Sequence, residues 1–283
     1  MRRVLLAVAL LALLGAAAAW SSGRSEDAAT PNRFDGRAAW AFLKRQVALG
    51  PRPAGSRRSR ELAAMLRRSV RGGRFQAVPG GLRNVVAVIP GRSPRRKVVL
   101  GAHYDTKDLP GFVGANDGAS GTAVVRQLAR AIRPRQLRPT LIVVFFDGEE
   151  VARGRPDSQF ERYGLRGSKV AASAFRSAEA AIVLDFVGDR DLEIPREQYS
   201  NVRLWTRLRA AAARTGSSRH FPARQQNAVL DDHIAFLRRG IPAIDLIDFD
   251  FPCWHKRCDD LTAVSEDSLD AVGETVMVFL AGL

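Results

Sequence analysis

The sequence is poor in the side chains that bind metals through sulfur or imidazole nitrogen. Its 283 residues include two cysteines and four histidines. Cys253 and Cys258 flank the segment WHKR, so they lack the Cys-x-x-Cys spacing that is typical of thiolate metal sites. In an exported protein this pair is predicted to form a disulfide across a tight loop, with two free thiols as the alternative.

Acidic residues are also scarce relative to basic ones. The chain has 29 Asp and Glu against 44 Lys and Arg, a formal net charge of +15. Nucleic-acid-binding proteins are often this basic, but they carry the charge in recognisable motifs. Here the arginines are scattered along expected helices and loops, such as LRRSVRGGR and RLRAAAARTG, without interleaved aromatic residues. We therefore predict no nucleic-acid partner and a solvated basic surface, at most weakly attractive to anionic membranes or acidic substrates.

Long apolar runs are absent except at the N-terminus. The segment MRRVLLAVALLALLGAAAAWSSG has two arginines, an apolar run from Val4 to Ala19, and small residues at Ala17 and Ala19. This layout is typical of a secretory signal peptide with cleavage after Ala19. The alternative is an uncleaved anchor, although the run is shorter than the ~20 residues of a membrane span. Either interpretation predicts a periplasmic, cell-surface or secreted protein, with membrane contact only through an uncleaved N-terminal segment.

The rest of the chain has no internal repeat and enough hydrophobic residues for one core. We predict a signal peptide or anchor at 1–19, a linker at 20–35 and a single domain at 36–283. Strands are expected at 84–90, 97–103, 140–147, 180–188 and 243–247, and helices at 36–49, 57–70, 119–132, 202–215, 231–240 and 265–283, the last capped by Ser265. Uniformly apolar strands that alternate with helices predict an α/β fold, a three-layer α/β/α sandwich with a mixed, mostly parallel central sheet.

Polar side chains gather where the expected strands end. The strand in LIVVFFDGEEV runs directly into Glu149 and Glu150, although burying a carboxylate is costly unless it is paired or bound to metal. Other strand ends carry His103, Asp105, Asp147 and Asp185. Because sites in such sheets lie at the carboxyl ends of strands, we expect these side chains to share one site.

Four segments together predict a zinc site: GAHYDTK, GANDGASG, FFDGEEV and FPCWHKRCDD. A hydrolytic zinc site needs three or more nitrogen or oxygen ligands, an open position and a separate carboxylate base. Any one segment alone is weak, and their co-occurrence at successive strand ends carries the prediction. Of the histidines, His103 and His255 fall in this pattern. His220 is interpreted as a loop residue, and His233, at a helix start, as a capping or structural residue.

The order of these motifs resembles the zinc-dependent aminopeptidase family, which has the phosphorylase/hydrolase-like α/β fold. The resemblance extends from GPRPAGS to the last helix. The segments FVGAND, FFDGEE, DDHIAFLRRGIPAIDLI and FPCWH followed by DD further resemble one branch, the glutaminyl-peptide cyclotransferases. DDHIAFLRRG is the long and specific match, whereas the others are shared more widely.

The resemblance implies a zinc ion bound by Asp117, Glu150 and His255. It makes Glu149 the general acid/base, so the two adjacent glutamates would divide their work. One would bind the cation and the other would move protons, with a pKa tuned towards the working pH.

The resemblance also assigns roles around this zinc. In a two-metal aminopeptidase His103 and Asp185 would bind a second zinc ion. In a one-zinc cyclase Asp185 and Asp231 would instead form a hydrogen-bonded acid network around Glu149. Asp105 would orient His103, and Trp254 would line the substrate pocket.

Two reactions at a peptide N-terminus therefore remain open. We favour cyclisation of an N-terminal glutamine to pyroglutamate with release of ammonia, and the alternative is hydrolysis of the first peptide bond. Arg155 and Asp245 depart from the animal cyclases, which carry tryptophan and histidine there, and GANDGASG is closer to the aminopeptidases. A non-catalytic binding protein of this fold is disfavoured, because every expected catalytic position is filled.

Overall fold

The computed structural model describes residues 34–151 and 154–283 of the chain. The strands are β1 Arg74–Val78, β2 Leu82–Ile89, β3 Ser93–His103, β4 Pro139–Phe146, β5 Ala180–Asp185 and β6 Ala243–Ile247. The helices are α1 Gly36–Ala48, α2 Arg57–Ser69, α3 Ala119–Ala131, α4 Phe160–Tyr163, α5 Arg166–Ala174, α6 Val202–Arg214, α7 His233–Leu237 and α8 Glu266–Ala281, with short 3-10 turns at Asp157–Gln159 and Ser218–His220.

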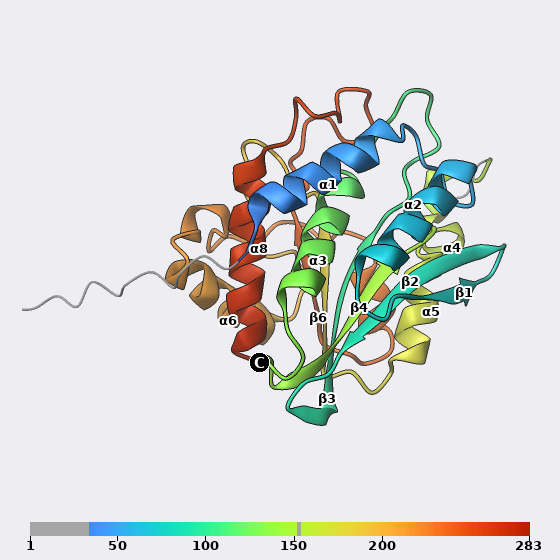
Figure 1. Ribbon diagram of the computed structural model, residues 1–283. Helices are drawn as coiled ribbons and strands as arrows, with labels where there is room; N and C mark the ends of the chain where they lie inside the picture. The colour runs from blue at the N-terminus through green and yellow to red at the C-terminus, as the bar shows by residue number, and fades with distance from the viewer. Residues whose placement is uncertain (1–33, 152–153) are drawn as a thin grey trace, which may run out of the picture.

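The strands form one mixed sheet in the order β1-β2-β4-β3-β5-β6 (Figure 1). The pairs β1–β2 and β2–β4 are antiparallel, whereas β4, β3, β5 and β6 run parallel. Helices α1, α3 and α8 pack on one another over one face, and α5 packs on α7 over the other. This is the predicted three-layer α/β/α sandwich, and the fold class is confirmed.

The alternation of side chains along β4 shows why this strand is apolar throughout. Leu141, Val143 and Phe145 enter the core beneath α1, α3 and α8. Ile142 and Val144 enter the core beneath α5 and α7. Because successive side chains of a strand point to opposite faces, a strand covered on both sides must be hydrophobic at every position.

The predicted helix ends agree closely with the structure, and one expected helix is too long. The Ser265 side chain accepts the backbone N–H of Ser268 and caps α8, as the sequence indicates. The helix expected at 231–240 is shorter, α7 at His233–Leu237, whereas the one expected at 57–70 ends one residue early, at Ser69. The extended backbone of Val70 ends α2, and Gly72, with φ +67°, lies in the turn that leads back to β1.

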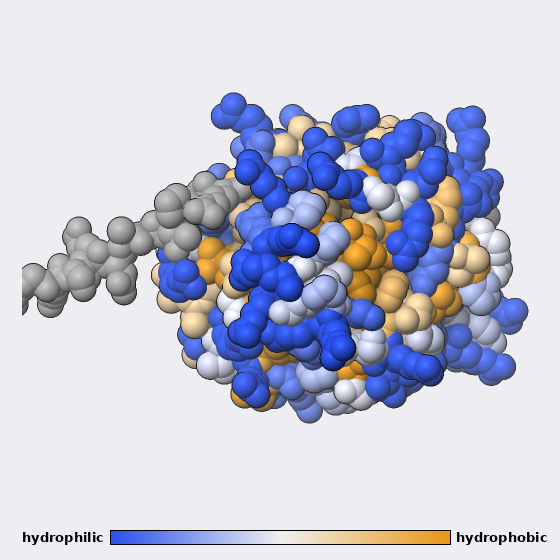
Figure 2. All heavy atoms as spheres, turned by 60° about the horizontal axis from the view of Figure 1, so that its bottom comes forward, coloured by the Kyte–Doolittle hydropathy of each residue, from blue (hydrophilic) through white to orange (hydrophobic). Residues whose placement is uncertain are grey.

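Most of the surface on the face shown in Figure 2 is hydrophilic, with apolar side chains visible in smaller areas between. This appearance fits the predicted solvated surface, and the absence of a nucleic-acid partner stays a prediction. The predicted signal peptide and most of the linker fall in residues 1–33, outside the described residues. Across 34–151 and 154–283, none of the helices combines the length and hydrophobicity that a membrane crossing requires.

Candidate metal centre and active site

The parallel strands bring the predicted site residues to one edge of the sheet. β3 ends at His103, directly beside Phe146 at the end of β4, and β5 ends at Asp185 on the other side of β3. Glu149 and Glu150 follow the end of β4 within four residues. The turn before α3 supplies Asp117, and the loop between β6 and α8 supplies His255.

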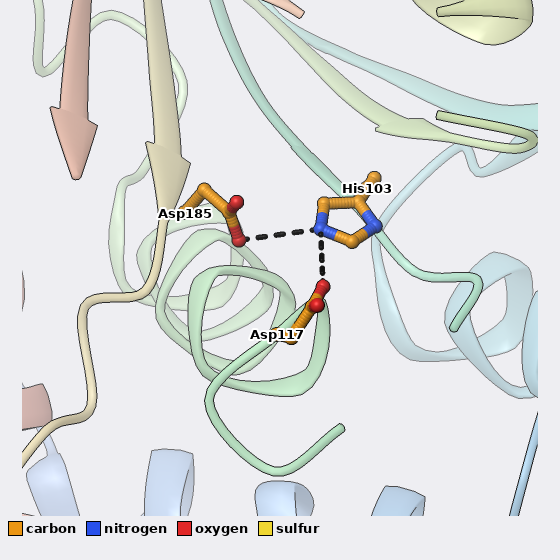
Figure 3. A group of neighbouring side chains, drawn as sticks. All are labelled: His103, Asp117 and Asp185. Carbon is orange, nitrogen blue, oxygen red and sulfur yellow. Dashed lines mark hydrogen bonds and ion pairs between the residues drawn. The ribbon is translucent and has the colours of Figure 1, made fainter. Parts of the chain in front are cut away.

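His103, Asp117 and Asp185 form one compact group (Figure 3). The Nε2 atom of His103 lies 3.2 Å from Oδ1 of Asp185 and 3.3 Å from Oδ1 of Asp117. All three side chains are buried. Their spacing lets one ion contact a nitrogen and two carboxylate oxygens.

Asp117, Glu150 and His255 form a neighbouring group. The Nε2 atom of His255 lies 3.3 Å from Oε1 of Glu150 and 3.5 Å from Oδ2 of Asp117. Asp117 therefore belongs to both groups, and each of its oxygens faces a different histidine.

The donor atoms of both groups fit a divalent cation such as zinc. Buried Oδ2 of Asp117 accepts no hydrogen bond from the residues that the structure describes. Burial, and then the nearby Glu150 carboxylate, raises the pKa of Asp117 to about 6. Burial lowers the pKa of His103, but Asp185 and other facing carboxylates outweigh it and raise that pKa well above its ordinary value. The cluster thus attracts positive charge, and its mixed nitrogen and oxygen donors are those that zinc uses.

Asp105 holds the turn that carries the two glutamates. Its Oδ1 accepts the backbone N–H of Gly148 at 2.9 Å and of Glu149 at 3.2 Å, and its Oδ2 accepts that of Glu150 at 3.3 Å. Oδ1 also lies 3.8 Å from Nδ1 of His103, the residue that Asp105 was predicted to orient. The geometry therefore gives Asp105 a main role in placing the glutamates, which the sequence did not indicate.

Two further residues outside the predicted set hold the turn that carries Asp117. The carboxylate of Asp259 accepts the backbone N–H of Asn116 at 2.6 Å and of Asp117 at 3.0 Å. The fully buried guanidinium of Arg52 donates to the carbonyl oxygen of Val113 at 2.8 Å. Both contacts fix backbone that precedes α3, so they determine where the shared carboxylate lies.

Glu149 stands outside both metal-binding groups and faces the cavity. Its Oε2 lies 4.0 Å from Nδ1 of His103, and its side chain is buried. Burial is the largest cause that raises the pKa of Glu149 well above its ordinary value; among the neighbouring charges, His103 opposes the rise and Glu150 adds to it. A carboxyl group with a raised pKa is suited to accept and return protons near neutral pH.

A cavity of about 300 Å³ opens onto these groups. Its polar lining includes Asp117, Glu149, Glu150, Asp157, Asp185, Asp231, Lys107 and His255. Its apolar lining includes Phe160, Phe186, Val229, Leu230, Ile247, Phe249 and Trp254. The indole of Trp254 stacks on the His255 ring with centroids 4.7 Å apart, in the wall of this cavity. His103 is buried and is absent from this lining, whereas its neighbours Asp117 and Asp185 belong to it.

The predicted disulfide is confirmed between Cys253 and Cys258, with Cα atoms 5.4 Å apart. It closes a short loop that contains Trp254 and His255. The His255 backbone has φ 52°, in the left-handed region that residues other than glycine rarely adopt. The disulfide therefore closes the loop around a candidate metal ligand whose backbone has an unusual conformation.

Comparison with known proteins identifies the family. Residues 84–280 match the model of peptidase family M28. The chain belongs to this family. It is 30% identical over 251 residues to the glutaminyl-peptide cyclotransferase of Bothrops jararaca, which covers 73% of this chain and 68% of that protein. The resemblance predicted from the motifs is thereby confirmed.

Solved structures agree with this assignment. The glutaminyl cyclase of Porphyromonas gingivalis superposes with a TM-score of 0.78 at 29% identity, over 89% of this chain and 99% of that one. A Zn-dependent exopeptidase from Parabacteroides distasonis superposes with a TM-score of 0.73 at 26% identity, over 87% and 98%. These relatives are glutaminyl cyclases and a zinc-dependent exopeptidase, which confirms that this family member is an enzyme.

Proposed function

We propose that this protein is a zinc-dependent glutaminyl-peptide cyclotransferase, which converts the N-terminal glutamine of a peptide to pyroglutamate and releases ammonia. The proposal rests on which of the two candidate metal groups lines the cavity with all of its members. Asp117, Glu150 and His255 all line it, together with Glu149. Of the other group, Asp117 and Asp185 line the cavity and His103 does not, so only the first group presents all of its ligands. One accessible metal beside one free carboxyl group is sufficient for cyclisation, because water is not the nucleophile.

Asp117, Glu150 and His255 would hold the zinc ion, which when bound polarises the side-chain amide carbonyl of the glutamine. The acidic lining favours binding of the substrate's amino terminus, which reacts as the free amine after losing one proton to solvent. Glu149 then takes a proton from the α-amine as its nitrogen attacks the amide carbon. The bond from that carbon to the amide nitrogen breaks, and Glu149 returns the proton to the leaving ammonia.

Zinc-dependent hydrolysis by an aminopeptidase is the second candidate. It is favoured by the group of His103, Asp117 and Asp185, because Asp117 presents one oxygen to each histidine. A carboxylate shared between two ligand groups suits a pair of metals that act on one water molecule. In that case His103 and Asp185 would bind the second ion, and Glu149 would be the base.

Product analysis separates the two reactions. Zinc-loaded protein without residues 1–19 is expected to remove one ammonia from a Gln-initiated peptide and to leave a Leu-initiated peptide intact, as read by mass spectrometry. Glu149→Gln, treated identically, is expected to leave both peptides unchanged. Loss of a whole N-terminal residue from either peptide would replace the cyclase proposal with the aminopeptidase one.

The proposed substrates are peptide or protein N-termini outside the cytoplasm. Export is supported by the composition of residues 1–19 and by the disulfide, since such bonds persist mainly in oxidising compartments. Among the described residues, Cys253 and Cys258 are the only cysteines, and both are bonded.

Removing the disulfide is expected to weaken zinc binding. The left-handed backbone conformation of His255 costs roughly 1–3 kcal/mol. The closed loop offsets this cost because it limits the other conformations that the residue can adopt. In the double variant Cys253→Ser/Cys258→Ser we therefore expect the Kd for zinc to rise about tenfold, a change of ~1.4 kcal/mol. Competition with a chromophoric chelator measures this without thiol reductants, which themselves bind zinc. Parental affinity in the double variant would show that the disulfide does not position His255.

A further inference from the structure

Behind the cavity wall lies a second cluster of titratable groups that the proposed reaction does not use. His233 is the first residue of α7, Asp245 lies in β6, and Glu197 lies in the segment between β5 and α6. All three side chains are completely buried. Burying two carboxylates and an imidazole together is stable only if their charges compensate.

The two nitrogens of the His233 ring face different carboxylates. Nε2 lies 3.2 Å from Oε2 of Glu197, and Nδ1 lies 3.3 Å from Oδ2 of Asp245. A neutral imidazole carries a hydrogen on only one nitrogen, whereas the imidazolium carries one on each. Neither ring nitrogen is placed for a hydrogen bond, so the two carboxylates face the ring at ion-pair distance, an arrangement that a charged ring satisfies on both sides.

The titration of the same groups agrees with this geometry. Burial lowers the pKa of His233, but Asp245 and then Glu197 outweigh it and raise the pKa to about 9. Burial raises the pKa of Glu197, but His233 and the backbone N–H groups that it accepts outweigh it and lower the pKa. Both shifts favour an ion pair between His233 and Glu197 at neutral pH. Burial raises the pKa of Asp245, and His233 opposes that rise, so Asp245 ionises less readily than Glu197.

Glu197 connects this ion pair to the cavity wall. Its Oε1 accepts the backbone N–H of Tyr199 at 2.9 Å and of Val229 at 3.2 Å, and its Oε2 accepts that of Ser200 at 2.8 Å. Val229 lines the cavity, and so does Asp231, two residues later. The segment 228–231 is thus attached to a carboxylate whose own position depends on His233.

We propose that His233 is a buried imidazolium that positions the cavity wall 228–231, and with it Asp231, by pairing with Glu197 on one side and Asp245 on the other. The positioning matters for catalysis because neither oxygen of Asp231 accepts a hydrogen bond from the described residues. The position of this carboxyl group therefore follows that of the backbone that carries it. This consequence rests on the proposed function, whereas the charge state of the ring does not.

Other charged groups surround the cluster. Asp231 and Asp232 precede His233 on its own segment, and Asp185 in β5 interacts with Asp245. On α5, Lys169 interacts with Asp232 while donating to nearby carbonyl oxygens. Asp231, His233 and Asp245 are also close enough together to hold a metal ion. Such an ion needs an unprotonated ring nitrogen, so it excludes the proposed state, and experiment can separate the two.

Nitrogen NMR of the histidine rings in the zinc-loaded protein tests the charge state. The His233 ring, assigned from the spectrum of His233→Gln or by through-bond correlation if that variant does not fold, is expected to be protonated on both nitrogens at pH 7.5. It should lose a proton only as the pH approaches about 9, and excess zinc should not move its signals. A neutral ring at pH 7.5, or a ring that shifts with zinc, would overturn the proposal.

Kinetics and thermal unfolding test the positioning. We expect His233→Gln to lower kcat by about 10²-fold, since misplacing a catalytic group by 1 Å can cost that much, with KM and zinc content near parental values. The matched control His220→Gln, at an imidazole outside the cavity lining, should retain parental kcat. A His233→Gln variant that is less stable but keeps parental kcat would reduce His233 to a structural residue and refute its positioning role.

The pH dependence of stability has a defined sign. Because the folded-state pKa of His233 exceeds its ordinary value of 6.5, its ion pairs stabilise the protein fully below about pH 6.5 and cease to do so as the pH rises through about 9. The Tm difference between the parent and His233→Gln should therefore shrink above pH 9, and a constant difference would contradict the proposal. If neither test peptide is converted, the proposed function fails, but the NMR and Tm results still decide the state of His233.

Discussion

Glu149→Gln is expected to lower kcat for the Gln-initiated peptide by about 10²–10⁴-fold, the usual contribution of a general acid/base. Glutamine keeps the shape of the side chain but cannot take a proton from the attacking amine. Because Glu149 belongs to neither metal-binding group, zinc content should remain parental. Steady-state kinetics with metal analysis of the same sample measures both quantities.

A matched control separates loss of this carboxyl group from a general change in charge. Glu179 is exposed and pairs with Arg96 on the surface, so Glu179→Gln should leave kcat and zinc content unchanged. If Glu149→Gln keeps parental kcat, the proton must be moved by another group, and Asp185 or Asp231 becomes the first candidate. If it loses zinc as well, the division of roles between Glu149 and Glu150 is wrong.

The part of the site that could be predicted from the sequence is the part built at strand ends. Apolar strands such as 140–146 are recognisable because every residue is buried, and the polar residues that follow them must then lie at one edge of the sheet. His103, Glu150 and Asp185 follow from this rule. The C-terminal helix cap at Ser265 was likewise visible, because its signal lies within a few residues.

The supporting residues could not be predicted because their partners are distant in sequence. Asp259 accepts the N–H of Asn116 across 143 positions, and its role is invisible until the fold brings the two loops together. Glu197 acts in the same way on Val229. Every residue except proline carries the same backbone N–H group, so no sequence motif shows which carboxylate that group binds. For the same reason the sequence does not show which carboxylates pair with His233, and it predicts only a capping or structural role for this residue.

The two metal groups share a residue, and this makes one substitution decisive. Asp117→Asn removes the negative charge that both groups share and replaces one of the two oxygens by an amide nitrogen that does not bind zinc. Asp185→Asn alters only the group around His103. We expect Asp117→Asn to bind no zinc at micromolar concentrations and to have no measurable turnover. Asp185→Asn should keep one zinc ion per chain, as measured by metal analysis after gel filtration.

Thermal unfolding gives a readout for Asp117→Asn that does not depend on activity. A ligand at a thousand times its Kd stabilises the folded state by about 4 kcal/mol, so added zinc should raise the Tm of the parent but not that of Asp117→Asn. Without zinc the variant should be no less stable than the parent at neutral pH, because burial and Glu150 raise the pKa of Asp117 to about 6, so ionising this carboxyl opposes folding. A zinc-dependent rise in Tm that survives in Asp117→Asn would mean that the stabilising ion binds elsewhere. The shared carboxylate would then not be the centre of the site.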